Sequence, residues 1–147
     1  MPDVTGIIES ALYVDSMRRS VEFYSRVFGF RCEHVSERVT ALRVAPGQVL
    51  LIMERGASST PGVMPFGTVP PSDARGQQHL AFGVAPHRFG SWLRRLELRG
   101  VGIESTIDWP EGGRSVYFRD PDDHSIELKT SDWGGQLFDA PAEPESG

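Results

Sequence analysis

The feature that most restricts the fold of this chain is an internal repeat with a period of roughly 70 residues, counted from Glu9 to His79. Residues 6–54 and 77–130 each predict the same order of elements: a strand, a helix and three strands. The first strands of the two copies match position by position, as Glu9-Ser10-Ala11-Leu12-Tyr13-Val14 and His79-Leu80-Ala81-Phe82-Gly83-Val84. At 147 residues, the chain is expected to form one domain, or two small modules that share a core.

The first copy predicts a strand over residues 6–14, followed by a helix that Asp15 or Ser16 caps. This helix carries apolar side chains at helical spacing and ends at Gly29. The apolar positions are Met17, Val21, Tyr24 and Phe28. The three strands that follow are predicted at residues 30–36, 38–44 and 48–54.

The second copy predicts a strand over residues 77–84 and a helix that opens at Pro86 and ends at Gly100. The apolar positions of this helix are Phe89, Trp92, Leu93 and Leu96. Its three strands are predicted near 102–107, 114–119 and 124–129. The last two form a hairpin whose turn, Asp120-Pro121-Asp122-Asp123, combines a proline with carboxylates that bond their own backbone. His124 follows this turn, and we expect it to be exposed.

Three polar residues stand out on predicted strands. Glu127 lies in the middle of the last strand, where β propensity disfavours a carboxylate, and a solvated outer face is the simplest explanation of it. Glu9 and His79 hold equivalent positions in the two copies, each two residues before a small alanine, Ala11 or Ala81. If a pseudo-twofold axis relates the copies, these faces meet around a cavity that Glu127 closes.

The composition excludes several classes of protein. Apolar residues make up 39% and charged residues 24% of the chain, as in soluble globular proteins. A net charge of −5 argues against a nucleic-acid or anionic-membrane partner. No apolar run is long enough to cross a bilayer, and the first residues lack the apolar core of a signal peptide. A single cysteine, Cys32, excludes an internal disulfide and fits a reducing cytoplasm, the expected location.

Residues 55–76 are rich in Gly, Ser and Pro and show no periodic pattern, which predicts a long loop. The loop nevertheless holds three apolar residues, Val63, Met64 and Phe66, which a free linker does not need. We therefore predict a mobile lid or entrance whose apolar residues touch bound ligand. A passive connector between the two copies is the alternative.

Four segments of the chain carry a family resemblance: residues 12–24 with 27–30, 76–82, 98–101 and 117–128. In these segments the sequence resembles the vicinal oxygen chelate superfamily, which holds glyoxalase I, extradiol dioxygenases, fosfomycin-resistance enzymes and bleomycin-resistance proteins. With the repeat, the resemblance covers residues 6–130. It implies an α+β fold, in which two βαβββ modules form a cup-shaped mixed and antiparallel sheet around a cavity.

In terms of domains, the resemblance implies a single glyoxalase-like domain over residues 1–147. Its parts are module one at about 6–54, a connecting loop at 55–76, module two at about 77–130 and a tail at 131–147.

Carried over by position, the resemblance implies a metal site of Glu9, His79 and Glu127, with Glu127 also catalytic. The first ligand is commonly His or Gln in the family, whereas this chain has Glu9. The place of a fourth ligand falls on Ile52 or Met53, so three protein ligands and open coordination positions are expected. One imidazole and two carboxylates suit Mn²⁺, Fe²⁺, Zn²⁺ or Ni²⁺, and Mg²⁺ less tightly; they differ from the two-His-one-carboxylate set of iron oxygenases.

Five further residues are predicted to contact substrate. Tyr13 lies on the cavity face of the first strand, Arg114 begins a strand of the last hairpin, and Trp109 lies in the loop before it. Met64 and Phe66 come from the long loop. The guanidinium group of Arg114 could bind an anionic substrate group through two N–H donors at once. Core packing is the alternative for Tyr13, and a solvated strand end is the alternative for Arg114.

The resemblance implies a metal-dependent enzyme that chelates a small oxygen-rich substrate, in the lyase, isomerase, thiol transferase or dioxygenase class. A metal-free binding or sequestering protein of the bleomycin-resistance type is the alternative, and the matched carboxylates favour the enzyme. A purely structural or interaction role has only the aromatic tail in its favour. Because the family commonly pairs modules across chains, and because Trp133, Leu137 and Phe138 offer apolar surface, a homodimer is expected.

Overall fold

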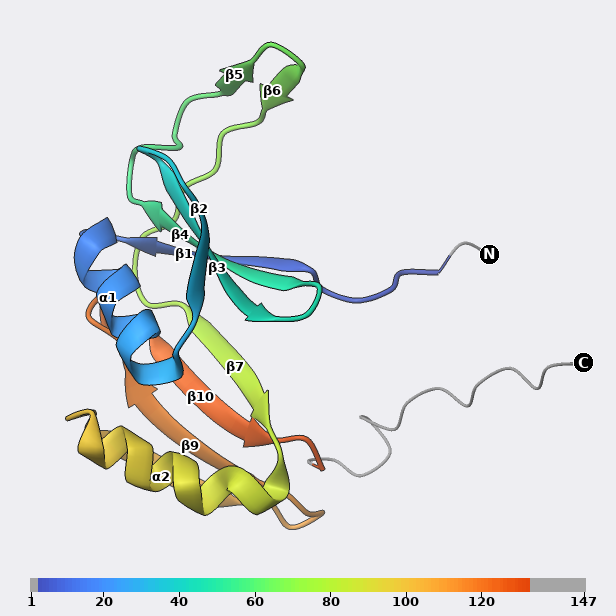
Figure 1. The fold of residues 1–147 in the computed structure, drawn as a ribbon, viewed down its shortest axis with the longest axis vertical. Helices are drawn as coiled ribbons and strands as arrows, with labels where there is room; N and C mark the ends of the chain where they lie inside the picture. The colour runs from blue at the N-terminus through green and yellow to red at the C-terminus, as the bar shows by residue number, and fades with distance from the viewer. Residues whose placement is uncertain (1–2, 133–147) are drawn as a thin grey trace, which may run out of the picture. The chain divides into compact units, whose positions relative to one another are not determined.

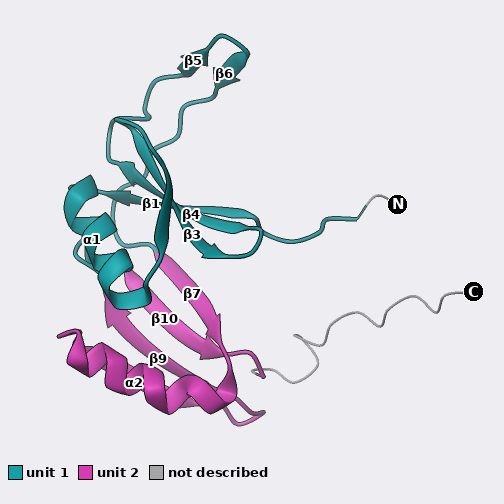
Figure 2. Ribbon diagram, viewed as in Figure 1, with its two compact units in different colours: residues 1–78, 120–124 teal, residues 79–119, 125–147 magenta. Residues whose placement is uncertain are grey.

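The computed structural model describes residues 3–132 and has an α+β fold with two four-stranded mixed sheets (Figure 1). The chain divides into two compact units (Figure 2), which are Met1–Gln78 with Asp120–His124 (unit 1) and His79–Arg119 with Ser125–Gly147 (unit 2). Each unit holds one copy of the predicted strand–helix–three-strand repeat, so the predicted fold class is confirmed. Within the described residues, no helix has the length and apolar character needed to cross a membrane.

Unit 1 is a four-stranded sheet with one helix on it. Its elements are β1 (Glu9–Val14), α1 (Met17–Phe28), β2 (Arg31–Val35), β3 (Val39–Ala45) and β4 (Gln48–Glu54), so the first strand is shorter than predicted. The strand order is β1-β4-β3-β2, with β1 parallel to β4 and the other pairs antiparallel. One sheet face carries the buried Leu12, Leu50 and Ile52, and α1 contacts β3 and β4. The core of unit 1 therefore lies between α1 and this face.

Helix α1 begins and ends where the sequence predicts. Ser16 is the N-cap, and its Oγ accepts a hydrogen bond from the Arg19 backbone at 3.3 Å. Gly29 ends the helix with a φ of 77°, which a residue without Cβ adopts without strain. The buried positions are Ser20, Phe23, Tyr24 and Val27. Of the predicted inner face only Tyr24 is fully buried, because the apolar stripe is wide and its outer members pack at the margin.

Residues 55–76 contain a short antiparallel hairpin of β5 (Gly62–Met64) and β6 (Gly67–Val69). The prediction that this stretch has no regular element is therefore wrong. Strands of three residues are shorter than the window over which alternation becomes visible in a sequence. Val63 and Phe66 of this hairpin are strongly exposed.

Unit 2 repeats the topology of unit 1. Its elements are β7 (His79–Val84), η1 (Pro86–Arg88), α2 (Phe89–Leu98), β8 (Ile103–Asp108), β9 (Arg114–Arg119) and β10 (Ser125–Thr130). The strand order is β7-β10-β9-β8, with β7 parallel to β10. Phe89 and Leu96 of α2 are buried, as are Phe118 and Leu128 of the sheet. Pro86 opens a 3-10 turn rather than the α-helix itself, since α2 begins three residues later.

Candidate functional site

Two of the three predicted metal ligands, His79 and Glu127, lie together in unit 2. His79 begins β7 and pairs with Ser125 of β10 in the parallel ladder. Glu127 lies two residues after Ser125 in β10, so its side chain is on the same sheet face as that of His79. Its partner in the ladder is the small Ala81. The Nε2 atom of His79 is 3.3 Å from Oε1 of Glu127.

The two ring nitrogens of His79 have different roles. Nδ1 lies 2.9 Å from the backbone oxygen of Ser125, and because that oxygen only accepts hydrogen bonds, Nδ1 carries the ring proton. In the neutral ring, Nε2 then presents a lone pair to the Glu127 carboxylate. Two electron-rich atoms at this separation are stabilised by a cation, which is either a second proton on the ring or a metal ion.

Glu127 is 2% exposed, so the alternative of a solvated outer face is wrong. Its Oε2 accepts a hydrogen bond of 2.5 Å from the Ser115 hydroxyl. That hydroxyl in turn accepts one of 2.8 Å from the indole Nε1 of Trp109. Burial, followed by the charge of Glu127 and the hydrogen bond to it, raises the pKa of Tyr117, which pairs with Glu127 across the β9–β10 ladder. One carboxylate oxygen is thus held by protein donors, while the other faces His79.

Lys129 adds a positive charge beside this carboxylate. Its Nζ lies 3.5 Å from Oε2 of Glu127 and 5.1 Å from the centre of the Trp109 ring. Trp109 therefore contacts both side chains that bind Oε2 of Glu127, namely Ser115 and Lys129. Of the two residues of unit 2 predicted to contact substrate, Arg114 and Trp109, Trp109 is the one near the His79–Glu127 pair.

Glu9 belongs to unit 1, where it is exposed and begins β1. Across residues 3–132, no three or more His, Cys, Asp or Glu side chains are grouped so that they could hold a metal ion. The structure therefore brings two of the three predicted ligands together, and the participation of Glu9 stays a prediction.

Arg114 lies on the other face of the unit 2 sheet from Glu127. Its Nε donates to Asp108 Oδ1 at 2.7 Å, and its guanidinium is centred 4.4 Å from the Phe89 ring of α2. The next residue, Ser115, contacts Glu127, and side chains of successive strand residues point to opposite faces. The structure therefore does not bring Arg114 to the candidate metal ligands.

The remaining predicted contacts lie in unit 1. Tyr13 is buried, and its hydroxyl donates a hydrogen bond of 2.6 Å to Ser72 Oγ. Met64 lines a cavity of about 300 Å³ beneath the β5–β6 hairpin, whereas Phe66 does not line it and is 85% exposed. Contact of these residues with substrate stays a prediction.

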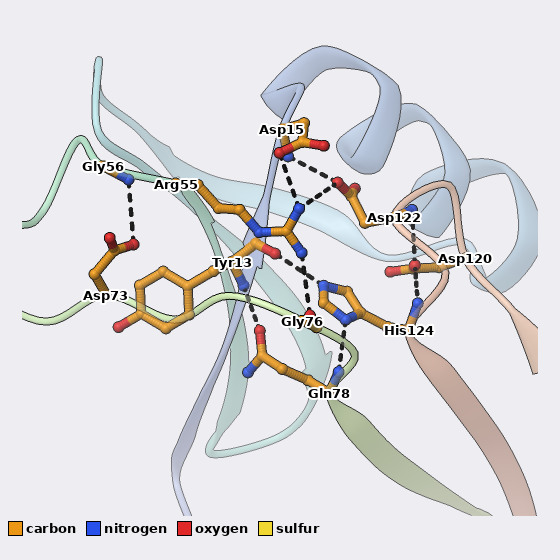
Figure 3. A network of polar contacts seen from close by, with 10 residues as sticks. All are labelled: Tyr13, Asp15, Arg55, Gly56, Asp73, Gly76, Gln78, Asp120, Asp122 and His124. Carbon is orange, nitrogen blue, oxygen red and sulfur yellow. Dashed lines mark hydrogen bonds and ion pairs between the residues drawn. The ribbon is translucent and has the colours of Figure 1, made fainter.

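Unit 1 contains a buried polar network that the sequence does not predict (Figure 3). His124 lies at its centre. The expectation that His124 is exposed is wrong, because its exposed fraction is 0%. Its Nδ1 accepts a hydrogen bond of 2.8 Å from the Gln78 backbone, and its Nε2 donates one of 2.8 Å to the backbone oxygen of Tyr13. A neutral ring with the proton on Nε2 satisfies both partners.

Asp120 anchors the other side of this turn. Its carboxylate accepts hydrogen bonds from the Tyr24 hydroxyl at 2.6 Å and from the backbone of Asp122 and His124 at 3.0 and 2.9 Å. Burial, and then the charge of Asp120, raises the pKa of Tyr24 far above its ordinary value. The signal available in the sequence was a turn with three carboxylates and a histidine, more polar groups than a hairpin turn needs.

Arg55 completes the network at its solvent side. Its Nη1 lies 2.9 Å from Asp15 and 3.6 Å from Asp122, and its Nη2 donates to the backbone oxygen of Gly76 (Figure 3). These contacts attach residues 120–124 to the ends of β1 and β4. The network is therefore structural, in that it fixes the turn within unit 1.

Comparison with known proteins agrees with this topology. The family model described as "Glyoxalase/Bleomycin resistance protein/Dioxygenase superfamily" matches residues 6–128. A catechol-2,3-dioxygenase of Bacillus subtilis is 29% identical over 129 residues, which are 84% of this chain and 41% of that protein. A glutathione transferase FosA of Serratia marcescens is 35% identical over 82 residues, which are 54% of each chain. The matches span 38 to 54% of the length of the curated relatives.

A solved structure gives the same result for the fold. The crystal structure of a lactoylglutathione lyase from Agrobacterium tumefaciens superposes with a TM-score of 0.81. The two sequences are 29% identical, and the match covers 90% of this chain and 99% of that one. A dioxygenase, a transferase and a lyase are thus all similar to this chain.

Proposed function

Because the chain belongs to the glyoxalase/bleomycin resistance protein/dioxygenase superfamily, we propose that it is a divalent-metal-dependent enzyme that acts on a small oxygen-rich substrate. One observation carries the metal dependence: Nε2 of His79 lies 3.3 Å from a carboxylate oxygen of the nearly buried Glu127, while Nδ1 lies beside the backbone oxygen of Ser125. The reaction belongs to one of the four classes that the family resemblance implies, namely lyase, isomerase, thiol transferase or dioxygenase.

The pair fits a metal ion in its chemistry and its spacing. Nitrogen and oxygen ligands bind a dication such as Zn²⁺ at about 2.1 Å, so two ligands at a right angle are about 3.0 Å apart. The 3.3 Å between His79 and Glu127 is close to this separation. The Ser125 carbonyl that accepts the Nδ1 proton is the kind of partner that orients a ligating histidine. Glu9 is the proposed third ligand, supported by its position in the repeat.

The protein side chains around the pair have separate roles. Ser115 and Lys129 hold Oε2 of Glu127, so Oε1 stays directed at His79. Trp109 fixes the Ser115 hydroxyl and covers Lys129. A bound dication would supply Lewis acidity toward substrate oxygens or a bound water. Imidazole and carboxylate ligands favour Mn²⁺, Fe²⁺, Zn²⁺ or Ni²⁺.

The proposal is tested by metal binding in three proteins. Elemental analysis of wild-type protein purified without chelator is expected to show one bound dication per chain. Glu127→Gln should weaken its affinity by more than about 100-fold, beyond the loss typical of residues that only contact a ligand. Glu104→Gln removes an exposed carboxylate of the same unit, which pairs with Arg119, and should leave the affinity unchanged. Retention of tight, stoichiometric metal by Glu127→Gln would overturn the assignment.

A second candidate is a metal-free small-molecule binding protein, and Lys129 favours it. With Nζ at 3.5 Å from Glu127, the carboxylate already has a cationic partner in the protein. In this case the cation between His79 and Glu127 is a second ring proton. NMR of the His79 ring separates the two, because added dication perturbs the Nε2 signal selectively only if the metal binds there.

Two further properties are proposed rather than observed. We propose that the protein is a homodimer; Trp133, Leu137 and Phe138, whose apolar side chains support this, lie outside the described residues. We also propose a cytoplasmic location, which a single cysteine supports.

A further inference from the structure

The β5–β6 hairpin of unit 1 forms one side of a partly open cavity of about 300 Å³. Its walls are mostly apolar and come from Val39, Met53, Val63, Met64 and Val69, which belong to the sheet strands β3 and β4 and to both hairpin strands. Met53 pairs with Val39 on one side and with Tyr13 on the other, so the cavity lies on the sheet face opposite α1. Every lining residue is within unit 1.

Among the residues that line the cavity, Arg38 is the one that carries a charge. The Arg38 guanidinium lines the cavity and is anchored along one edge: Nε donates to the backbone oxygen of Ala57, and Nη2 donates to both oxygens of Thr60 at 3.0 Å. All of these acceptors are neutral. Among residues 3–132, no carboxylate forms an ion pair with Arg38.

The remaining nitrogen, Nη1, is on the cavity side. A Cβ built on Gly62, itself a lining residue, would lie 3.5 Å from it, so the backbone leaves space there because residue 62 is glycine. Ser58 and Ser72 also line the cavity, and Ser72 is oriented by the Tyr13 hydroxyl. The cavity thus combines an apolar body with one fixed cation and hydroxyls at its margin.

We infer that this cavity binds a small organic anion, with an apolar body against Met53 and Met64 and a carboxylate on Arg38. Arg38 is half-buried, and no carboxylate among the described residues forms an ion pair with it. An anionic ligand would supply that partner, and guanidinium groups match carboxylates in geometry. An apolar cavity of about 150 Å³ holds benzene, so this one has room for roughly ten non-hydrogen atoms. Aromatic and branched-chain monocarboxylates have this size and charge.

The inference is independent of the metal proposal, because it uses no residue of unit 2. It is tested with benzoate as the probe and with benzyl alcohol as its neutral counterpart of similar shape. Both are titrated into the full chain in the presence of a chelator, and binding is followed by the backbone amide signals of Gly62, Val63 and Ser72. Benzoate should shift these signals in a saturable manner and bind about tenfold or more tightly than benzyl alcohol.

Three variants localise the binding. Arg38→Met should weaken benzoate binding about tenfold or more. Arg43→Gln, in the strand β3 that follows Arg38, removes a cation paired with the exposed Glu33 and should not change it. Gly62→Leu keeps Arg38 and its loop contacts but places a side chain toward Nη1, and it should also abolish the shifts. Absence of benzoate binding to the wild type, equal binding of benzyl alcohol, or unchanged binding by Gly62→Leu would each overturn the inference.

Discussion

Ser115 is the side chain on which the orientation of Glu127 most depends. Its hydroxyl donates a hydrogen bond to Oε2 of Glu127 and accepts one from the indole N–H of Trp109, so its removal leaves both groups without this partner. We expect Ser115→Ala to lower metal affinity about tenfold, the magnitude typical of groups that orient a ligand. Isothermal titration with Mn²⁺ measures this. Ser105→Ala removes an exposed hydroxyl next to Tyr117 in the β8–β9 ladder, and an equal loss in that variant would contradict the role given to Ser115.

Tyr24 should make the protein sensitive to alkaline pH. Burial and Asp120 raise its pKa in the folded state above the ordinary value of 10.0. Below pH 10 the phenol is neutral in both the folded and the unfolded chain, so its contribution to stability is complete. Above pH 10 the unfolded chain loses this proton while the folded chain keeps it, so the free energy of unfolding falls as pH rises.

Tyr24→Phe tests this directly. The variant should lose about 1–3 kcal/mol at neutral pH, because an oxygen of the buried Asp120 loses its donor. Its stability should also decline less steeply than that of the wild type above pH 10. Urea unfolding at a series of pH values measures both effects, and parallel curves for the two proteins would show that Tyr24 ionises as easily in the folded state as in the unfolded one.

Among the secondary-structure elements, the β9–β10 turn carries the one described non-glycine residue with positive φ. Asp123 has a φ of 64°, in the left-handed region that aspartate tolerates and β-branched residues do not. Asp123→Gly and Asp123→Val both remove the contact with Gln77 but differ in backbone freedom. We expect the glycine variant to be within about 0.5 kcal/mol of wild type and the valine variant to lose about 1–3 kcal/mol. Similar unfolding midpoints for the two variants would rule out backbone strain as the cause.

The sequence predicts elements better than it predicts the partners of the turns. The strands and helices follow from local periodicity, whereas the grouping of His79 with Glu127 is implied by the family resemblance rather than by the repeat, which aligns His79 with Glu9. His124 is different, because its acceptor on Tyr13 is 111 residues away in the chain. No local pattern carries that information, so a histidine after a turn looks exposed. Arg114 shows the same limit: strand alternation identifies two faces of a strand, but only the packed structure shows that the Arg114 face is the one that contacts Phe89 of α2.

At the level of the whole molecule, we expect the protein to be a homodimer. We expect light scattering to give twice the chain mass of 16.2 kDa at about ten-micromolar concentration. A control variant, Leu137→Asp, changes the apolar tail and should shift the equilibrium toward monomer if the tail contributes. A wild-type mass near that of one chain under these conditions would remove the case for a homodimer.

The position of residues 120–124 has a consequence for how such a chain can be divided. They lie between β9 and β10 in the sequence, yet they belong to unit 1, where Asp120 accepts the Tyr24 hydroxyl and His124 joins Gln78 to Tyr13. A gene fragment that ends at Gln78 therefore lacks residues 120–124 of unit 1, including the buried Asp120 and His124, which only the downstream part of the chain supplies. Cutting the chain at residue 78 therefore does not separate the two repeats cleanly, because the turn between β9 and β10 of the second repeat is part of unit 1.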